Sequence, residues 1–308
     1  MKAVVERETE VVRAQLTRNG IDIYQGDALF QDPHTVEVQD NGEKTPLRAE
    51  KILVACGTRP AHSPEIPFDN RRIVDTDHLS GLVGLPKEVI LVGAGVVGIE
   101  YTSFLAALGA GVTLIDQRTT ILEFVDRQIV EALSYHLRQA GVTFRLAEAV
   151  TRVGIDQARD RVVAELESGK KVQGDALIYA VGRQANGDQL HLAAAGLAAD
   201  SRGRLKVNEF SQIDVPQIYA AGDVIGFPAL ASTSMEQERL ATSHMFGIPF
   251  EHMPKLFPYP CLPSPEVPCY GLLRRPSRLK MNSLRSALAA AAASQKITRN
   301  PGKGKHQI

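Results

Sequence analysis

Residues 90–101 read ILVGAGVVGIEY and place a glycine-rich turn between an apolar strand and a helix. Gly93 permits the tight turn, Gly95 lets the backbone approach a pyrophosphate, and Gly98 allows the helix to pack closely on the strand. The unpaired amides at the start of the helix favour phosphate groups. The stretch therefore predicts a dinucleotide-binding βαβ unit. Its expected contacts to the dinucleotide come from Gly93, Ala94, Gly95, Val96, Val97 and Gly98.

The strand after this helix ends in an acidic residue. Residues 111–116 read GVTLID, so Asp116 lies 23 residues after Gly93, where a carboxylate binds a ribose 2′-hydroxyl. Asp116 favours NAD(H), because its charge repels a 2′-phosphate. Arg118 either pairs with such a phosphate, which favours NADP(H), or is a solvated loop residue. Together the two residues suit a site that accepts both nucleotides.

Glu100 lies on the first turn of the same helix, two residues after Gly98. One interpretation is that its charge stabilises the positive end of the helix dipole. The other is a catalytic position beside a nicotinamide ring. The residues alone leave both interpretations open.

The segments around this unit alternate between strand and helix patterns. Residues 88–93, 111–116 and 176–182 are apolar enough for buried parallel strands, and 97–108 and 126–141 have helical spacing. This alternation predicts an α/β fold with a doubly wound, Rossmann-type sheet covered on both faces. Strands are also predicted over 142–155 and 161–168. Elsewhere we expect helices over 3–18 and 228–247, strands over 21–30, 34–40 and 50–57, and two or three strands within 203–226.

Composition excludes several classes of protein. The chain is 44% hydrophobic and 23% charged, which is ordinary for a soluble globular protein. Nine Lys and Arg against one acidic residue fall in 260–308, so the rest is mildly acidic and lacks the basic field of a nucleic-acid-binding domain. The three cysteines form no CxxC pair, which favours a reduced cytoplasmic setting. We expect no signal peptide, membrane span or metal site.

Four motifs in order resemble the two-dinucleotide flavoprotein oxidoreductases, the superfamily of dihydrolipoamide dehydrogenase and glutathione reductase. They are KILVACGTRP (51–60), GAGVVGIE (93–100), LIYAVGRQAN (177–186) and IYAAGDVIG (218–226). Within that superfamily, YQGDALF (24–30) and LIDQR (114–118) are most similar to the soluble, FAD-containing pyridine nucleotide transhydrogenases. The resemblance runs from the start of the chain to about Tyr259.

This resemblance implies an FAD-dependent oxidoreductase that transfers hydride between NADPH and NAD⁺ through a flavin. The implied cofactors are FAD, NAD(H) and NADP(H). A dihydrolipoamide dehydrogenase or related disulfide reductase is the alternative within the superfamily. A catalytically silent NAD(H)-binding remnant is the alternative of another class.

Further binding residues are implied by the resemblance alone. Gly182 and Arg183 would belong to the nicotinamide nucleotide site. Asp223 would bind a flavin ribityl hydroxyl, unless it is an ordinary turn aspartate. The backbone around Ala28 would approach the adenine of FAD. The residues expected to line or pack along the flavin are Cys56, Gly57, Thr58, Ala229, Leu230, Ala231 and Ser232, with Cys56 as a small buried filler rather than a reactive thiol.

The resemblance also divides the chain into domains. A Rossmann-type NAD(P)-binding domain, 61–185, is expected to interrupt a partial FAD-binding domain made of 1–60 and 186–250. We expect the family's first FAD-binding segment to be missing and 251–308 to be an aberrant, disordered tail in place of the interface domain. A homodimer is expected of the full-length family, but the interface domain is expected to be absent here.

Overall fold

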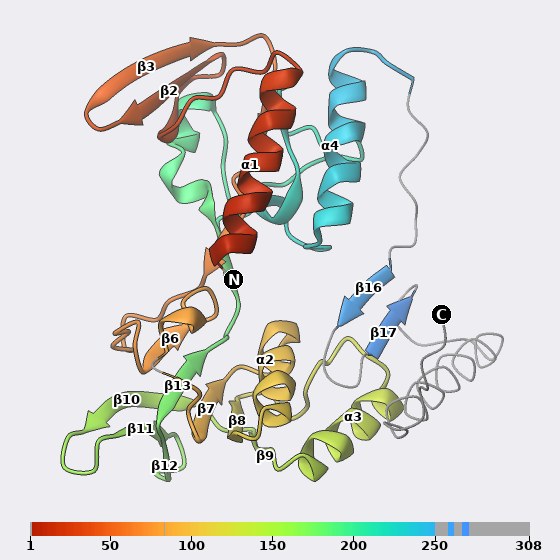
Figure 1. The fold of residues 1–308 in the computed structure, drawn as a ribbon. Helices are drawn as coiled ribbons and strands as arrows, with labels where there is room; N and C mark the ends of the chain where they lie inside the picture. The colour runs from red at the N-terminus through yellow and green to blue at the C-terminus, as the bar shows by residue number, and fades with distance from the viewer. Residues whose placement is uncertain (1, 83, 250–257, 262–266, 271–308) are drawn as a thin grey trace, which may run out of the picture. The chain divides into compact units, whose positions relative to one another are not determined.

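The computed structural model describes residues 2–82, 84–249, 258–261 and 267–270 (Figure 1). Contacts group the chain into two compact units. One is built from Met1–Gly57 and Ala185–Met253, and the other mainly from Thr58–Gln184. The chain therefore runs from the first unit into the second and back.

The second unit is built on a five-stranded sheet in which neighbouring strands are parallel. Helices α2 (Val96–Ala107) and α3 (Arg127–Gln139) follow the third and fourth strands of the sheet order. This arrangement confirms the predicted Rossmann-type α/β fold. The sheet order is β6 (Ile73–Asp75), β13 (Ala176–Tyr179), β7 (Glu88–Val92), β8 (Gly111–Asp116) and β9 (Thr143–Leu146).

The two faces of this sheet bury alternate residues of its strands. Leu91 packs with Ile99 of α2 and Leu133 of α3 in one core cluster. Ile90 packs with Val162 in another cluster on the opposite face. Because both faces are covered, the strand residues 89–92 are apolar without alternation, as the sequence indicates.

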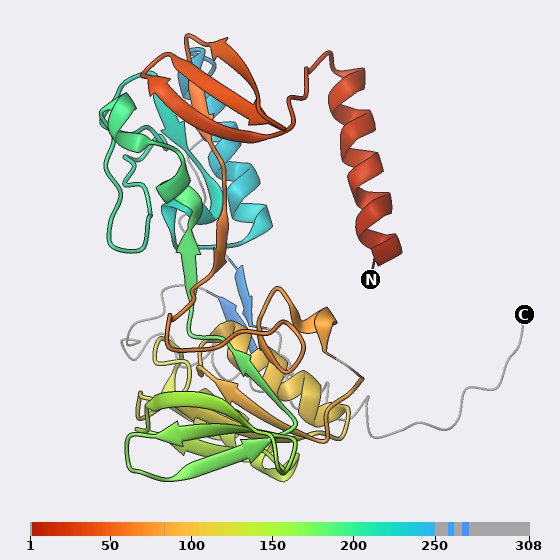
Figure 2. The ribbon, with the colours of Figure 1, turned by 90° about the vertical axis from the view of Figure 1, so that its left-hand side faces the viewer.

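The cover of the second face is a sheet rather than a layer of helices. It consists of β10 (Val150–Asp156), β11 (Arg161–Leu166) and β12 (Lys171–Gly174), which pair antiparallel (Figure 2). The sequence predicts β11, but its single strand over 142–155 is wrong, because the structure divides that stretch into β9 and β10 at Ala147, whose φ is 55°. The departure of β10, β11 and β12 from the parallel sheet is not predicted either. Short turns join them, and strands joined by short turns pair antiparallel.

The first unit combines an antiparallel sheet with a short parallel pair. Strands β1 (Asp27–Asp32), β2 (Thr35–Asp40) and β3 (Glu43–Arg48) form the former. Strands β4 (Ile52–Val54) and β15 (Ile218–Ala220) form the latter. Helices α1 (Lys2–Arg18) and α4 (Ala231–Met245) are the long helices described in this unit. Its core gathers Phe30, Val54, Leu205, Ile218 and Val224.

Several expected elements of the first unit are shorter than predicted. The strand expected over 21–30 begins only at Asp27, where pairing with Gln39 starts. Ile21 and Ile23 are about half exposed instead. Within 203–226 the structure has one strand, β15, with isolated bridges beside it. In both places strand-forming residues lack a partner strand, and β-propensity alone does not make a strand.

The remaining elements are short. Strand β5 (Thr58–Pro60) pairs with β14 (Arg183–Ala185). Most of the tail predicted for 251–308 lies outside the described residues, but two strands within it, β16 (Pro258–Cys261) and β17 (Val267–Tyr270), pair antiparallel. Single 3₁₀ turns are η1 (Leu79–Gly81), η2 (Asn186–Gln189), η3 (Leu192–Ala195) and η4 (Gly222–Ile225).

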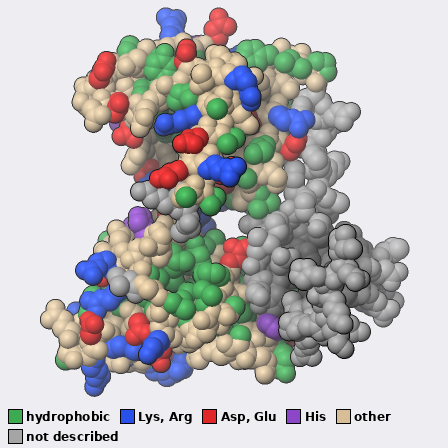
Figure 3. All heavy atoms as spheres, in the orientation of Figure 1, with side chains coloured by type: hydrophobic (Ala, Val, Ile, Leu, Met, Phe, Trp, Pro, Cys, Tyr) green, Lys and Arg blue, Asp and Glu red, His purple; other side chains and the backbone are tan. Residues whose placement is uncertain are grey.

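On the face that Figure 3 shows, acidic and basic side chains are interspersed over each unit. Among the described helices, none has both the length and the apolar character that crossing a bilayer requires.

Candidate functional site

A cavity of about 100 Å³ lies at the carboxyl ends of the central strands of the parallel sheet. Residues that directly follow β6, β13 and β7 form its walls. In open α/β sheets, ligands bind at this edge. The lining residues are Thr76, Gly95, Val96, Val97, Ala180, Gly182 and Arg183.

Gly93 and Gly98 are required by the fold itself. Gly93 has a φ of 110°, and a Cβ there would overlap the carbonyl group of Ala180. A Cβ on Gly98 would overlap the carbonyl oxygen of Gly93. These two glycines therefore let helix α2 pack directly against the turn that follows β7.

Gly95 is not required by the fold. Its φ of −76° and ψ of −174° suit any residue, and a Cβ there would meet nothing within 4 Å. It is the N-cap of α2, and no side chain caps the helix. The open space beside free helix amides fits a ligand group that approaches the backbone closely, such as a pyrophosphate.

Asp116 ties this glycine turn to the end of β8. Its Oδ2 accepts hydrogen bonds from the N–H of Ala94 at 2.5 Å and from Arg118 Nη2 at 2.7 Å. Its Oδ1 accepts from the Arg118 N–H at 2.8 Å and from Arg118 Nε at 2.9 Å. Arg118 is thus paired with Asp116 rather than simply solvated.

The electrostatics of this pair keep Asp116 ionised. Asp116 is only 6% exposed, and burial acts to raise its pKa. The hydrogen bonds from Arg118 and Ala94 outweigh burial, so the pKa of Asp116 is lowered. A ribose hydroxyl at this carboxylate would share it with the guanidinium of Arg118.

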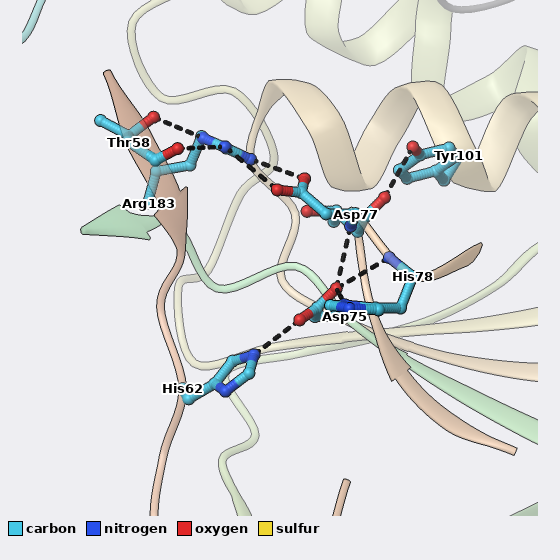
Figure 4. Close-up of polar contacts among 8 residues, drawn as sticks. Thr58, His62, Asp75, Asp77, His78, Tyr101 and Arg183 are labelled. Carbon is cyan, nitrogen blue, oxygen red and sulfur yellow. Dashed lines mark hydrogen bonds and ion pairs between the residues drawn. The ribbon is translucent and has the colours of Figure 1, made fainter. Parts of the chain in front are cut away.

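Arg183 connects the cavity wall to strand β5. Its Nε donates to the Thr58 hydroxyl at 2.7 Å and its Nη2 to the Thr58 carbonyl at 2.8 Å. Its Nη1 donates to Asp77 at 3.0 Å (Figure 4). Thr58, expected to line a flavin, therefore contributes to holding the arginine that lines this cavity.

Glu100 is half-buried on α2 and is not among the residues that line the cavity. Its neighbour Tyr101 donates its hydroxyl to the Thr76 carbonyl at 3.0 Å. Burial, followed by the charges of Asp77 and Glu100, raises the pKa of Tyr101, which keeps that hydroxyl protonated. Glu100 thus acts electrostatically on a residue that fixes the cavity wall.

The first unit brings together part of the residues expected at a flavin. Cys56 and Gly57 follow β4 and Asp223 follows β15, and these strands are parallel neighbours, so all three lie at one carboxyl edge. Burial raises the pKa of the Cys56 thiol, which suits a packing role. Gly57 has a φ of 65° with open space around its Cβ position.

The other residues expected at the flavin are more dispersed. Ala28 lies exposed on β1, which belongs to the other sheet of the unit. Ala229 and Leu230 precede α4, and Ala231 and Ser232 form its first two positions, both exposed. The Leu230 carbonyl accepts from the hydroxyls of Thr233 and Ser234.

The motifs do not contain Thr76 or Asp77, and the motif LIYAVGRQAN (177–186) contains Ala180 without marking it as part of this site. Thr76 and Asp77 follow β6, a three-residue strand within a stretch that has no motif. Ala180 follows β13 inside a predicted strand. The signal that identifies these residues is their position directly after parallel strands. For Thr76 and Asp77, this signal can be used only once β6 is known to be a strand of the sheet.

A second, larger cavity of about 680 Å³ lies at the opposite, amino-terminal edge of the same sheet. Arg71, Arg72 and Lys87 line it together with Asp69, Asp160 and Asp175. Arg72 is already paired with Asp160. The basic and acidic side chains that line this cavity balance one another, and the cavity lies away from the glycine turn. The smaller cavity is therefore the better candidate for the functional site.

The parallel sheet, the glycine turn at the start of α2 and the carboxylate ending β8 define a Rossmann-type dinucleotide-binding fold. The chain belongs to the pyridine nucleotide-disulphide oxidoreductase family, whose family model matches residues 2–237.

Curated relatives of this chain carry a more specific name. It is 46% identical over 270 residues to a soluble pyridine nucleotide transhydrogenase of Mycobacterium tuberculosis (strain ATCC 25177 / H37Ra), covering 87% of this chain and 57% of that protein. It is 42% identical over 244 residues to the protein of the same name from Colwellia psychrerythraea, covering 79% of this chain and 52% of that protein. The chain thus spans little more than half the length of these relatives.

Solved structures support the fold. The HOCl-induced flavoprotein disulfide reductase RclA from Escherichia coli is 26% identical with a TM-score of 0.76, over 87% of this chain and 63% of that chain. LpdA from Mycobacterium tuberculosis is 24% identical with a TM-score of 0.84, over 95% of this chain and 67% of that chain.

Substitutions at Gly98 and Gly95 distinguish a glycine that the fold requires from one that it does not require. Gly98→Ala should lower the free energy of unfolding by roughly 1–3 kcal/mol, because its Cβ forces α2 away from the turn. Gly95→Ser should keep wild-type stability within about 0.5 kcal/mol, because the site has room and serine is a good N-cap. Urea unfolding followed by circular dichroism measures both. A Gly98→Ala variant as stable as the wild type would contradict this account.

Removing the guanidinium of Arg118 should raise the pKa of Asp116. In the wild type the pKa of Asp116 is lowered, so this carboxylate stabilises the fold at pH values above its ordinary pKa of about 4. That stabilisation is lost as the pH falls through the folded-state pKa. In Arg118→Gln only the N–H groups of Ala94 and residue 118 still oppose burial, so the pKa of Asp116 rises and the loss begins at higher pH. Carboxyl-carbon NMR titration measures the shift, with Asp200, whose pKa is lowered to about 2, as an unchanged control in the first unit. An Asp116 pKa that stays low would show that Arg118 does not maintain it.

Proposed function

We propose that this chain carries the NAD(P)-binding part, and a portion of the FAD-binding part, of a soluble pyridine nucleotide transhydrogenase. That enzyme would be a flavoprotein that transfers hydride between NADPH and NAD⁺. The observation that carries the proposal is Gly95: a glycine that the fold does not need, beside open space and free helix amides in a cavity. The 46% identity to proteins of that name supports the specific activity.

The residues have distinct proposed roles toward the dinucleotide. Gly95, Val96 and Val97 bind the pyrophosphate through the amides at the start of α2. Asp116 accepts a hydrogen bond from the adenosine ribose of NAD(H), and Arg118, when it turns away from Asp116, pairs with the 2′-phosphate of NADP(H). The paired arrangement of these two side chains supports acceptance of both nucleotides.

The nicotinamide end would lie beyond the pyrophosphate. Gly182, with a φ of 133° and open space at its Cβ position, lets the backbone approach that end. Glu100 is proposed to lie near the reacting rings and to act through its charge. Arg183 shapes the wall through its bonds to Thr58 and Asp77.

The first unit fits part of an FAD site. Gly57 offers a positive-φ backbone position with open space, at the same carboxyl edge as Asp223. In this proposal Cys56, Gly57 and Asp223 contact the flavin nucleotide, and Ala231 and Ser232 contact it from the start of α4. Bound flavin would supply the group that accepts hydride from one nicotinamide and donates it to the other. A cytoplasmic location and a homodimer of the full-length enzyme belong to the same proposal, supported by the word "soluble" in the relatives' name and by the family resemblance.

One alternative has a specific observation in its favour. RclA, to which the chain is structurally similar at 26% identity, is a flavoprotein disulfide reductase. A related disulfide reductase, such as a dihydrolipoamide dehydrogenase, would use the same nucleotide site with another electron acceptor.

The test uses the purified 308-residue chain. The proposal predicts a bound-flavin spectrum that NADPH bleaches and NAD⁺ restores, with faster electron transfer to a NAD⁺ analogue than to lipoamide or another disulfide. Gly95→Ser is the matched control, because it should keep the flavin spectrum and fold but lose bleaching by NADPH. Faster reduction of a disulfide would favour the reductase alternative. A chain that binds NADH but no flavin would favour a silent NAD(H)-binding protein.

A further inference from the structure

The turn after β6 forms one wall of the nucleotide cavity. Thr76 lines the cavity, and Asp77 accepts a hydrogen bond from Arg183, which lines it as well. The Thr76 carbonyl is itself held by the hydroxyl of Tyr101 on α2. The position of this turn therefore sets the shape of the cavity on the β6 side.

The turn is held in place by Asp75, the last residue of β6, which is 1% exposed. Its Oδ1 accepts from the N–H groups of Asp77 and His78, both at 2.9 Å, and from His78 Nδ1 at 2.8 Å. Its Oδ2 accepts from His62 Nε2 at 2.6 Å (Figure 4). Burial acts to raise the pKa of Asp75, but these hydrogen bonds lower it overall. An ionised carboxylate only accepts, so both imidazoles donate to it.

His62 is anchored independently of this carboxylate. Its ring stacks on Phe68 with centroids 4.2 Å apart, and Phe68 meets the ring of Tyr179 edge-on at 5.7 Å. Tyr179 is the last residue of β13 and the register partner of Asp75 in β6. The cluster of Asp75, His62 and His78 is thus tied to the strand that leads into Ala180 at the cavity wall.

The strand order indicates which half of a dinucleotide this wall would face. The end of β8, with Asp116, lies on one side of β7, and the ends of β13 and β6 lie on the other. With the pyrophosphate at Gly95 and the adenosine ribose at Asp116, the nicotinamide half extends over the ends of β13 and β6.

We propose that Asp75, His62 and His78 are positioning residues for the nicotinamide half of the bound dinucleotide. They act by fixing the 75–78 turn, which presents Thr76 to the cavity and Asp77 to Arg183. This inference rests on the proposed dinucleotide binding and adds to it three residues that the motifs do not mark. It requires that loss of the cluster weaken binding of the nicotinamide half and leave binding of the adenosine diphosphate half unchanged.

The experiment compares the dissociation constants of NADH and of ADP by calorimetry on the 308-residue chain. Asp75→Asn keeps one oxygen for the turn but removes the negative charge and sets an amide donor against the His62 Nε2–H. His62→Leu removes that donor, so each variant should weaken NADH binding about three- to tenfold. ADP binding should change by less than about twofold, since its contacts lie at Gly95 and Asp116. His62→Gln keeps a donor at the position of Nε2 and should restore NADH affinity.

Asp69→Asn is the matched control. Asp69 holds a similar turn at the amino end of the same strand, accepting from the N–H groups of Arg71, Arg72 and Ile73, and should leave both affinities unchanged. Wild-type NADH affinity in both Asp75→Asn and His62→Leu would overturn the inference. So would equal weakening of NADH and ADP, which would mark a purely structural cluster. If the unaltered chain binds neither ligand, the proposed function itself fails and the inference fails with it.

Discussion

The close contact between helix α2 and the turn after β7 is the constraint on which the rest of the second unit depends. Gly98 lies against the carbonyl of Gly93, and Gly93 lies against the carbonyl of Ala180, so that neither position accepts a side chain. This contact brings the start of α2 to the carboxyl edge of the sheet. Of the three glycines, Gly95 alone has free space at its Cβ position, so the fold does not require glycine there. Gly93 and Gly98 thus serve the packing of the fold, whereas Gly95 is available for the proposed contact with a pyrophosphate.

Two buried carboxylates also hold the residues around the cavity in place. The buried carboxylate of Asp116 accepts from the Ala94 amide and pairs with Arg118, so it locks the turn to β8 while remaining ionised. On the other side of the cavity, the buried carboxylate of Asp75 accepts from two backbone amides and two imidazoles. Two ionised, hydrogen-bonded carboxylates therefore hold the cavity from opposite sides of β7. Each would be costly to bury without these partners.

Much of the βαβ unit can be predicted from sequence, and the reasons are local. The sequence predicts a helix over 97–108 and α2 spans Val96–Ala107. The agreement is close because glycines flank the run of apolar residues at both ends. Strand 111–116 matches β8 at both ends. By contrast, β6 has three residues and no pattern of its own, and it forms because β13, far along the chain, pairs with it. The residues Thr76, Asp77 and Asp75 depend on that pairing, so no local pattern reveals them. The antiparallel cover of the sheet and the unpaired stretch before Asp27 likewise depend on which strands find partners.

The most direct test of the central claim is a map of backbone amide shifts in the ¹⁵N-labelled, deuterated chain as NADH is added. The account predicts that the largest changes occur at Gly95, Val96 and Val97, followed by Asp116 and Gly182, and that Gly95→Ser abolishes them. Changes centred on the cavity at the opposite edge of the sheet, around Arg71 and Lys87, would contradict it. So would changes at the glycine turn that persist in Gly95→Ser.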